Sequence, residues 1–331
     1  MGDDELGRQL LACGYTPDGP GAAVAVRGAD ERVTTASTGH AAPGIPFHPD
    51  TTSYAGSVAK QVVGACAALV VVSGELSPEA PIGRLLPELP PWAARVRVRH
   101  LLHHTAGLPG DRQLNALIAE RGRPRWDGPA VLTALADCPE LEFQPGTQYR
   151  YRNAGYIVLA AVLARLANMP FPELADRLLF GPLGMHRSRF ADRPEAVPRD
   201  AATGHPAEDT QVRWPLPLSL GDGGLWTCVA DLHRWNDALL PGGALDQRAA
   251  ALMHTPGRLD DGQPIDYAWG VRVSTDFGTL THSHGGVWPG GWTAKLIRLP
   301  ELGIGIAAMS NSGDVPRMIE LSDRVAHSLT D

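Results

Sequence analysis

The chain has 331 residues, 44% of them hydrophobic, and a formal net charge of -7 at pH 7. That length is ample for a deep hydrophobic core, either in two ordinary domains or in one large domain with an inserted subdomain. The acidic balance and the scattering of the arginines exclude the charge footprint of a nucleic-acid-binding protein, so we expect no nucleic-acid partner.

The first residues of the chain predict a cytoplasmic protein. Acidic residues stand where a secretory signal carries basic ones, and no apolar signal core follows them. The longest apolar run, residues 62–72, is far shorter than the ~20 residues needed to span a bilayer, so we expect no membrane partner. Four cysteines lie far apart without a C-x-x-C pair, which favours reduced, mostly buried thiols. They are Cys13, Cys66, Cys138 and Cys228.

Both ends of the chain carry the patterns of β-strands. Two runs joined by a polar turn, residues 22–27 and 32–38, predict an N-terminal hairpin. Near the other end, turn signals separate four further strand-like runs. These runs are 267–273, 277–282, 292–299 and 303–309, and residues 314–328 then have helical spacing.

Helical patterns occupy the middle of the chain. They cover residues 57–73, 129–138, 154–167, 171–180 and 229–240, while 41–49, 87–92 and 195–217 have the composition of loops. This order predicts an α/β fold of the α+β type, in which a mainly antiparallel sheet from both chain ends is flanked by terminal helices and carries an inserted, mostly helical subdomain. We expect one domain over residues 1–331, with the sheet part at about 1–56 and 265–331 and the helical part at about 57–264.

Ser57 and Lys60 lie where an apolar helical run begins. Residues three apart share a helix face, so the two side chains are expected to meet. A hydroxyl at a helix start lies in the positive end of the helix field, where spare backbone N–H groups can stabilise an oxyanion. Serine alone is a poor nucleophile and needs a neighbouring base that is neutral near the working pH.

Composition points to Lys60 as that base. Lys60 and Lys295 are the only lysines, which leaves 27 arginines among the 29 basic residues. Arginine keeps its proton in a protein, whereas a desolvated lysine can lose it. A Ser-x-x-Lys sequence also arises by chance, and the alternative reading is a capping serine beside a solvated lysine.

Two later motifs support the chemical reading. Tyr151-Arg152-Asn153 precedes a predicted helix, and His284-Gly285-Gly286 lies at a predicted strand edge. With Ser57-x-x-Lys60, they resemble the three motifs of the class C β-lactamase-like branch of the serine β-lactamase, penicillin-binding protein and family VIII esterase superfamily. Residues 99–109, 182–185 and 223–227 are also similar to that branch, and the resemblance spans roughly residues 20–312.

The resemblance implies a set of roles for the motif residues. Ser57 would be the nucleophile, and Lys60 and Tyr151 would pass its proton, with the main base left open between them. Asn153 would hold Lys60 and a substrate carbonyl. The substrate-binding group would also include His284, Gly285, Gly286 and Val287, and the N–H groups of Val287 and Ser57 would form the oxyanion hole.

His284 is a departure from the family pattern. β-Lactamases typically carry lysine in the third motif, where its charge holds the substrate carboxylate, so we expect weak or absent β-lactamase activity. Asp222 is expected to favour a neutral or cationic substrate group. His284 also has a purely structural interpretation, and an alternative register through His282 lacks the following glycines.

Other residue clusters favour structural roles. His100, His103 and His104 have no carboxylate or cysteine nearby at ligand spacing, so we expect no metal and no cofactor. Four tryptophans are expected to line the cleft and to favour an apolar or aromatic acyl group. These are Trp226, Trp269, Trp288 and Trp292.

The sequence as a whole predicts a serine hydrolase that cleaves a small-molecule ester or small amide through an acyl-Ser57 intermediate. One alternative is a biosynthetic acyltransferase, an amide-forming enzyme or a peptidase that uses the same acyl-enzyme. Another is a non-catalytic binding module on the same fold. The chain has no G-x-S-x-G elbow, which counts against an α/β-hydrolase.

Overall fold

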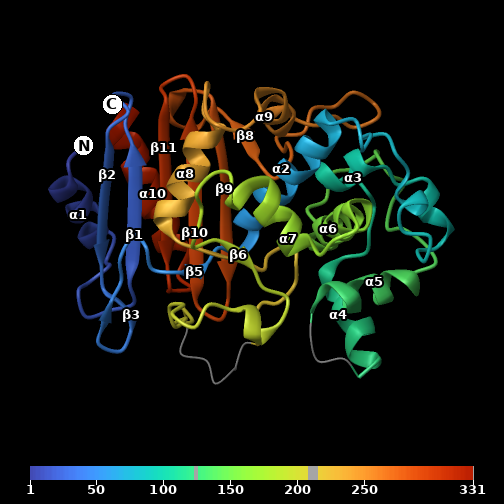
Figure 1. Cartoon of the computed structure of the whole chain (residues 1–331), viewed down its shortest axis with the longest axis horizontal. Helices are drawn as coiled ribbons and strands as arrows, with labels where there is room; N and C mark the ends of the chain where they lie inside the picture. Colours follow the sequence, from blue (N-terminus) through green and yellow to red (C-terminus); the bar gives the residue numbers. More distant parts are fainter. Residues whose placement is uncertain (123–125, 208–214, 331) are drawn as a thin grey trace.

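A six-stranded antiparallel sheet is assembled from both ends of the chain in the computed structural model, which describes residues 1–122, 126–207 and 215–330 (Figure 1). The strand order is β2-β1-β11-β10-β9-β8. The strands are β1 (Ala22–Arg27), β2 (Val33–Thr38), β8 (Arg272–Ser274), β9 (Thr281–Trp288), β10 (Trp292–Leu299) and β11 (Ile304–Ser310). The N-terminal hairpin joins the C-terminal strands through the β1–β11 pair, in which Ala22 lies opposite Ser310.

Side-chain alternation gives the sheet two buried faces. On β1, Ala22, Val24 and Val26 pack with α1 (Asp3–Ala12) and α10 (Val315–Thr330). Ala23 and Ala25 point to the other face, where α8 (Val229–Leu239) contacts β1, β10 and β11. The sheet is therefore enclosed by the terminal helices on one side and by the middle of the chain on the other.

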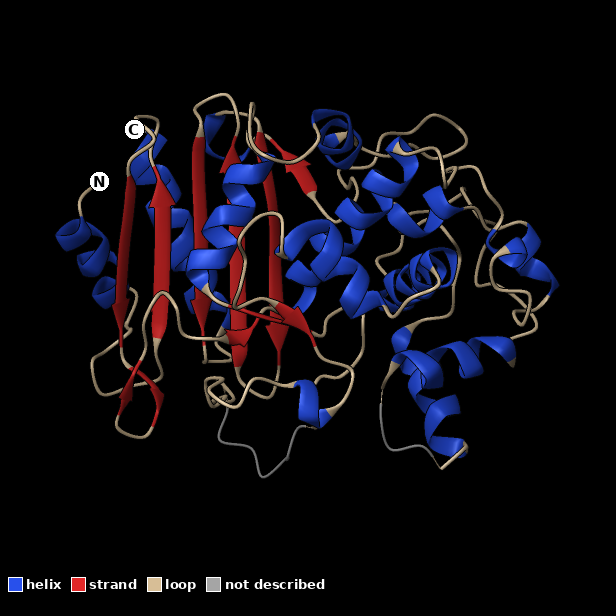
Figure 2. Cartoon of the chain, in the orientation of Figure 1, coloured by secondary structure: helices blue, strands red, loops and turns tan. Residues whose placement is uncertain are grey.

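The middle of the chain is mainly helical and lies beyond the β9 side of the sheet (Figure 2). Its helices are α2 (Ala59–Val72), α3 (Val98–Leu102), α4 (Asp111–Glu120), α5 (Gly128–Ala136), α6 (Asn153–Ala167), α7 (Phe171–Ala175) and α9 (Gln247–His254). A three-stranded sheet, β5-β7-β6, is built from β5 (Ser53–Tyr54), β7 (Leu225–Thr227) and β6 (Arg189–Phe190). A β-hairpin pairs β3 (His40–Ala42) with β4 (Ile45–Pro46).

Helix α2 is the central helix of the molecule. Its residues from Ala59 to Ala68 are all buried, and it contacts α6, α7 and α9. A helix that is apolar on every side is stable only inside a core. The turn that precedes it, Gly56–Val58, packs against β9. The turn is therefore held by the sheet, and the helix that follows is held by the other helices.

The structure confirms the predicted fold class. The N-terminal hairpin, the strand at 292–299 and the helices at 154–167 and 229–240 lie within one residue of their predicted bounds. The loop predicted at 195–217 includes residues 208–214, which lie outside the described residues. No single helix in the described ranges has both the length and the apolar composition to cross a membrane, although α6 and residues 171–180 pass that test jointly across a 79° bend.

Several predicted bounds are wrong. Residues 267–271 are not a strand, because this buried apolar run lies irregularly against α2, with Gly270 at a φ of 77° beside the carbonyl group of Lys60. The strand predicted at 277–282 begins only at Thr281, after a turn in which Phe277 has a φ of 62°. In the segment predicted as one α-helix at 171–180, the α-helix ends at Ala175, and residues 176–180 form a wider π-helical turn. Helices α4 and α9 and the β3–β4 hairpin were not predicted.

Candidate active site

Ser57 and Lys60 meet as the sequence spacing requires. Ser57 lies in the turn before α2, and Lys60 lies in the first turn of that helix. The Lys60 side chain is completely buried, and its Nζ donates to Ser57 Oγ at 3.0 Å. It also donates to Asn153 Oδ1 at 2.8 Å and to the backbone oxygen of Asp222 at 3.0 Å. The hydroxyl and the amine are therefore held in direct contact inside the protein.

The three contacts of Lys60 Nζ define what a neutral amine would do there. Two N–H groups can remain on the fixed acceptors of Asn153 and Asp222. The nitrogen lone pair would then point at Ser57 Oγ, where it can accept the hydroxyl proton. The geometry is thus suited to proton transfer without movement of the lysine.

Asn153 is oriented by a carboxylate that the sequence reasoning missed. Its Nδ2 donates to Asp111 Oδ2 at 2.7 Å, which leaves Oδ1 facing Lys60. Burial raises the pKa of Asp111, and the nearby Asp222 raises it further. Asp111 follows Gly110 at the start of α4, and only the unpredicted α4 brings it beside Asn153.

Tyr151 lies beside the Lys60 amine and is 38% exposed. Lys60 Nζ is 4.9 Å from the centre of the Tyr151 ring. The ring packs against His104 with centroids 4.3 Å apart, and His104 Nδ1 accepts the backbone N–H of Arg152 at 3.2 Å. Tyr151 therefore has one fixed face and one face that is open to solvent.

Strand β9 runs directly against the turn that carries Ser57. A Cβ atom added to Gly286 would lie 1.9 Å from the Ala55 oxygen and 2.9 Å from the Ser57 nitrogen. A Cβ atom on Gly56, which has a φ of 54°, would lie 2.5 Å from the Val287 nitrogen. The two glycines thus permit a close approach of β9 to the Ser57 turn, with the Ser57 nitrogen beside Gly286 and the Val287 nitrogen beside Gly56.

His284 lies on the sheet face that is turned toward the helical part. Its Nδ1 donates to the oxygen of Gly285 at 2.6 Å, so Nε2 accepts the hydroxyl of Tyr267 at 2.9 Å. Burial lowers the pKa of His284 to about 3, and the charge of Lys60 contributes to this. The ring is therefore neutral and both of its nitrogens are engaged. Its ring centre is 6.3 Å from that of Tyr151, and its part in substrate binding stays a prediction.

His282, which would begin the third motif in the alternative register, lies away from the Ser57–Lys60 pair. It pairs with Arg298 on β10, and its ring stacks on His254 of α9 with centroids 4.1 Å apart. Of the two registers considered, the His284-Gly285-Gly286 motif is the one that the strand places beside Ser57.

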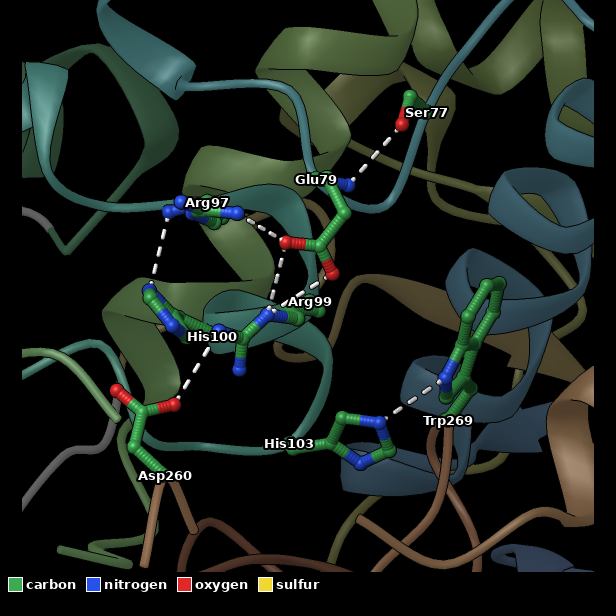
Figure 3. A network of polar contacts seen from close by, with 8 residues as sticks. All are labelled: Ser77, Glu79, Arg97, Arg99, His100, His103, Asp260 and Trp269. Atoms are coloured by element: carbon green, nitrogen blue, oxygen red, sulfur yellow. Dashed lines mark hydrogen bonds and ion pairs between the residues drawn. The ribbon is translucent and has the colours of Figure 1, made fainter. Parts of the chain in front are cut away.

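The histidines at 100, 103 and 104 make hydrogen bonds within the protein, and Figure 3 shows those of His100 to Arg97 and of His103 to Trp269. His100 Nδ1 accepts the backbone N–H of Arg97, and burial lowers the pKa of His100 to about 4. His103 Nδ1 donates to the oxygen of Tyr267, and its Nε2 accepts the indole N–H of Trp269 at 3.3 Å. Among the residues that the structure describes, no group of three or more His, Cys, Asp or Glu side chains could hold a metal ion.

Figure 3 also shows how this segment is tied to its surroundings. The Glu79 carboxylate forms ion pairs with Arg97 and Arg99, and Arg99 also forms an ion pair with Asp260 at 3.2 Å. These ion pairs are partly exposed, so their individual contribution to stability is small. They nevertheless connect the 97–103 segment to the 260–269 segment that supports His284 through Tyr267.

The tryptophan prediction needs correction. Trp226 and Trp292 are 1% and 8% exposed and pack with Tyr54 in a buried cluster. Trp269 is 4% exposed and is bonded to His103. These three rings therefore form part of the core rather than a wall open to a substrate.

Comparisons with known proteins agree with this architecture. A family model described as Beta-lactamase matches residues 8–329. A D-aminopeptidase of Gluconobacter oxydans (strain 621H) is 27% identical over 302 residues, which cover 88% of this chain and 56% of that protein. Esterase EstB of Burkholderia gladioli is 34% identical over 193 residues, which cover 54% of this chain and 47% of that protein.

A solved structure shows the same fold. The octameric penicillin-binding protein homologue of Pyrococcus abyssi superimposes with a TM-score of 0.81 at 23% identity, covering 98% of this chain and 76% of that one. The chain spans about half the length of the curated relatives it matches.

Proposed function

Because the chain belongs to the beta-lactamase family, we propose that it is a serine hydrolase that cleaves an ester or a small amide through an acyl-Ser57 intermediate. The observation that carries the proposal is the buried contact of 3.0 Å between Lys60 Nζ and Ser57 Oγ. The family also includes a D-aminopeptidase and an esterase among the relatives of this chain, and both names fit acyl transfer from a small substrate.

Acylation begins with proton transfer from Ser57. The neutral amine of Lys60 takes the hydroxyl proton while Oγ forms a bond to the substrate carbonyl carbon. Negative charge then develops on the carbonyl oxygen, where the N–H groups of Ser57 and Val287 receive it. The bond to the leaving alcohol or amine breaks, and the proton passes to that group through Lys60 or Tyr151, leaving the acyl-Ser57 ester.

Deacylation reverses the sequence with water as the nucleophile. Water loses a proton to the Lys60–Tyr151 pair and attacks the ester carbon, and Ser57 Oγ leaves with that proton. Among the proposed proton-transfer groups Ser57, Lys60 and Tyr151, Tyr151 is the most exposed, which suits it to exchange protons with groups that enter from solvent. Lys60 and Tyr151 lie side by side, so we assign the proton to the pair rather than to either residue.

The state of His284 argues against β-lactams as substrates. A lysine at this position would offer a charge to the substrate carboxylate, whereas the buried His284 is neutral at pH 7, with its pKa lowered to about 3. We therefore expect slow or no hydrolysis of a chromogenic cephalosporin under conditions in which simple esters are cleaved.

Covalent labelling tests the proposal. A fluorophosphonate should add one phosphonyl group to the wild-type chain at Ser57, located by peptide mass spectrometry, and Ser57→Ala should lose both the label and the hydrolysis of p-nitrophenyl acetate. Ser73→Ala, which changes the serine just after α2, is the matched control and should keep both. Unlabelled wild-type protein without Ser57-dependent hydrolysis would favour the non-catalytic binding module.

The same acyl-enzyme also serves the transferase alternative. An added amine or alcohol should divert product from the free acid to the new amide or ester if the second step accepts nucleophiles other than water. Product analysis by mass spectrometry separates the two reactions, because hydrolysis yields the acid alone.

A further inference from the structure

An apolar cavity of about 320 Å³ follows the side of α6 that begins at Asn153. Ile157, Ala160, Ala161 and Ala164 line it, and these positions share a helix face with Asn153. At a rise of 1.5 Å per residue, the lining extends from about 6 Å to about 16 Å along the helix from Asn153. The cavity therefore starts one helical turn from the residue that holds Lys60.

Two other segments that line the cavity are linked to Asp222, a contact of Lys60. Leu218 and Leu220 line it shortly before Asp222, whose backbone oxygen accepts Lys60 Nζ. Asp127 lines it at the start of α5, directly after Trp126, whose indole N–H donates to Asp222 Oδ2 at 3.1 Å. Three segments that line the cavity are thus close in sequence to residues that contact Lys60 or Asp222.

The lining determines what the cavity can accept. Alanines on α6 leave space that larger side chains would fill, and among the residues that the structure describes, no Lys, Arg or His side chain lines the cavity. Its two carboxylates are already engaged, because Asp127 caps the backbone N–H of Ala130 and Asp192 pairs with Arg193. A neutral apolar group fits these walls, whereas an anionic group would meet the carboxylates of Asp127 and Asp192.

We propose that this cavity, named here the α6 pocket, binds the apolar acyl chain of the substrate. The inference rests on the proposed function, because the acyl chain that the pocket would bind belongs to the ester or amide that Ser57 would cleave. The volume is roughly twice that of the ~150 Å³ cavity that holds benzene, so the pocket suits a medium-length alkyl or aryl-alkyl group. The scissile carbonyl would lie at Ser57 while the chain passes Asn153 into the pocket.

A chain-length series of p-nitrophenyl esters tests the pocket. From acetate through butyrate to hexanoate, kcat/KM of the wild-type protein should rise by about three- to fourfold for each methylene that enters the pocket. An ester of the same length with a terminal carboxylate should lose that gain, because its charge would meet the carboxylates of Asp127 and Asp192.

Filling the pocket should remove the preference. Ala161→Phe places a ring in the α6 pocket, and the hexanoate-to-acetate ratio of kcat/KM should fall close to one. Ala161→Leu fills less space and should give an intermediate ratio. The matched control is Ala167→Phe on the same helix, which faces a different cavity of about 210 Å³ and should keep the wild-type ratio.

A binding experiment separates this inference from the proposed function. Octanamide is titrated calorimetrically into Ser57→Ala protein, with and without Ala161→Phe, so that no turnover is needed. Binding that Ala161→Phe weakens at least tenfold supports the pocket even if no ester is cleaved. A hexanoate-to-acetate ratio that is equal in wild type and Ala161→Phe, or octanamide binding that the substitution leaves unchanged, overturns it.

Discussion

Lys60 is the residue on which the proposed chemistry depends, and its surroundings distinguish it from every arginine in the chain. Three fixed acceptors receive its amine, namely Ser57 Oγ, Asn153 Oδ1 and the oxygen of Asp222. A guanidinium cannot meet these acceptors from the same place, because its donors lie in a planar fork, and it cannot accept a proton. Charge alone therefore does not satisfy the site.

The substitution Lys60→Arg should reduce the acylation rate by about 10²- to 10⁴-fold, the usual range for the loss of a general base. Stopped-flow measurement of p-nitrophenol release gives this rate, and circular dichroism checks the fold. Lys295→Arg is the matched control, since Lys295 lies on the opposite face of β10 and should leave the rate near that of wild type. Acylation above a tenth of the wild-type rate in Lys60→Arg would mean that the base is misassigned.

We expect Asp111 to act as a positioning residue, because it is linked to Lys60 through its hydrogen bond with Asn153. Asp111→Ala removes the acceptor of Asn153 Nδ2, so the amide can rotate away from Lys60, and kcat should fall by about 10- to 100-fold. Asp111→Asn keeps an oxygen acceptor and should retain most of the activity. Equal losses in the two variants would contradict the positioning role.

The pH dependence of stability provides a second readout for Asp111. Burial raises the pKa of this carboxyl in the folded chain above its value in the unfolded chain, so stability is lost as the pH rises through the interval between these two pKa values. Asp111→Asn should therefore melt at a higher temperature than wild type at pH 7, and the difference should shrink toward pH 4. Thermal unfolding at both pH values measures it.

At the scale of elements, the contact between β9 and the Ser57 turn would set the geometry of the proposed oxyanion hole. Gly286 faces that turn without room for a Cβ atom, whereas a Cβ atom on Gly285 would find only ordinary contacts of 3.7 Å to the Ala294 oxygen and 3.8 Å to Lys295. Successive residues of the strand thus face a crowded and an open side, as the pleat requires.

Gly286→Ala should therefore lower kcat/KM for p-nitrophenyl acetate by 10²-fold or more, because β9 must move away from Ser57 and the two N–H groups separate. Gly285→Ala should retain activity within a few-fold. Steady-state kinetics of the two variants test the pair, and a Gly286→Ala protein as active as Gly285→Ala would show that the strand does not form the oxyanion hole.

At the scale of the whole molecule, buried polar contacts join the sheet to the helical part. Arg298 of β10 is completely buried and donates to Gln61 of α2 and Asn236 of α8 at 3.0 Å and 3.1 Å. Burial lowers the pKa of Arg298 to about 9. Because Gln61 directly follows Lys60, this cluster also fixes the helix that carries the active site to the sheet.

We propose on this basis that the chain unfolds as one domain. Urea unfolding followed by tryptophan fluorescence and by far-ultraviolet circular dichroism should give coincident transitions, since the sheet needs both chain ends and α8 packs against it. Two separated transitions would instead indicate that the helical part at about 57–264 folds independently.

The sequence by itself determined many of the local elements and the contact between Ser57 and Lys60. Ser57 and Lys60 are three residues apart on one helix start, so their contact follows from helix geometry without any tertiary information. The mainly apolar runs at 22–27 and 292–299 likewise indicated two strands, because a strand buried on both faces of a sheet is apolar along most of its length. Lysine scarcity and the ordered motifs then indicated the family.

Only the tertiary structure decided which distant residues support these groups. Asp111 and Trp126 reach Asn153 and Asp222 across a fold that no spacing rule encodes, and the neutral state of His284 depends on burial beside Tyr267. The misplaced strand at 267–271 has the same cause, since an apolar run reports burial but not backbone conformation. Contacts between residues far apart in the chain arise from packing, and packing is a property of the assembled molecule.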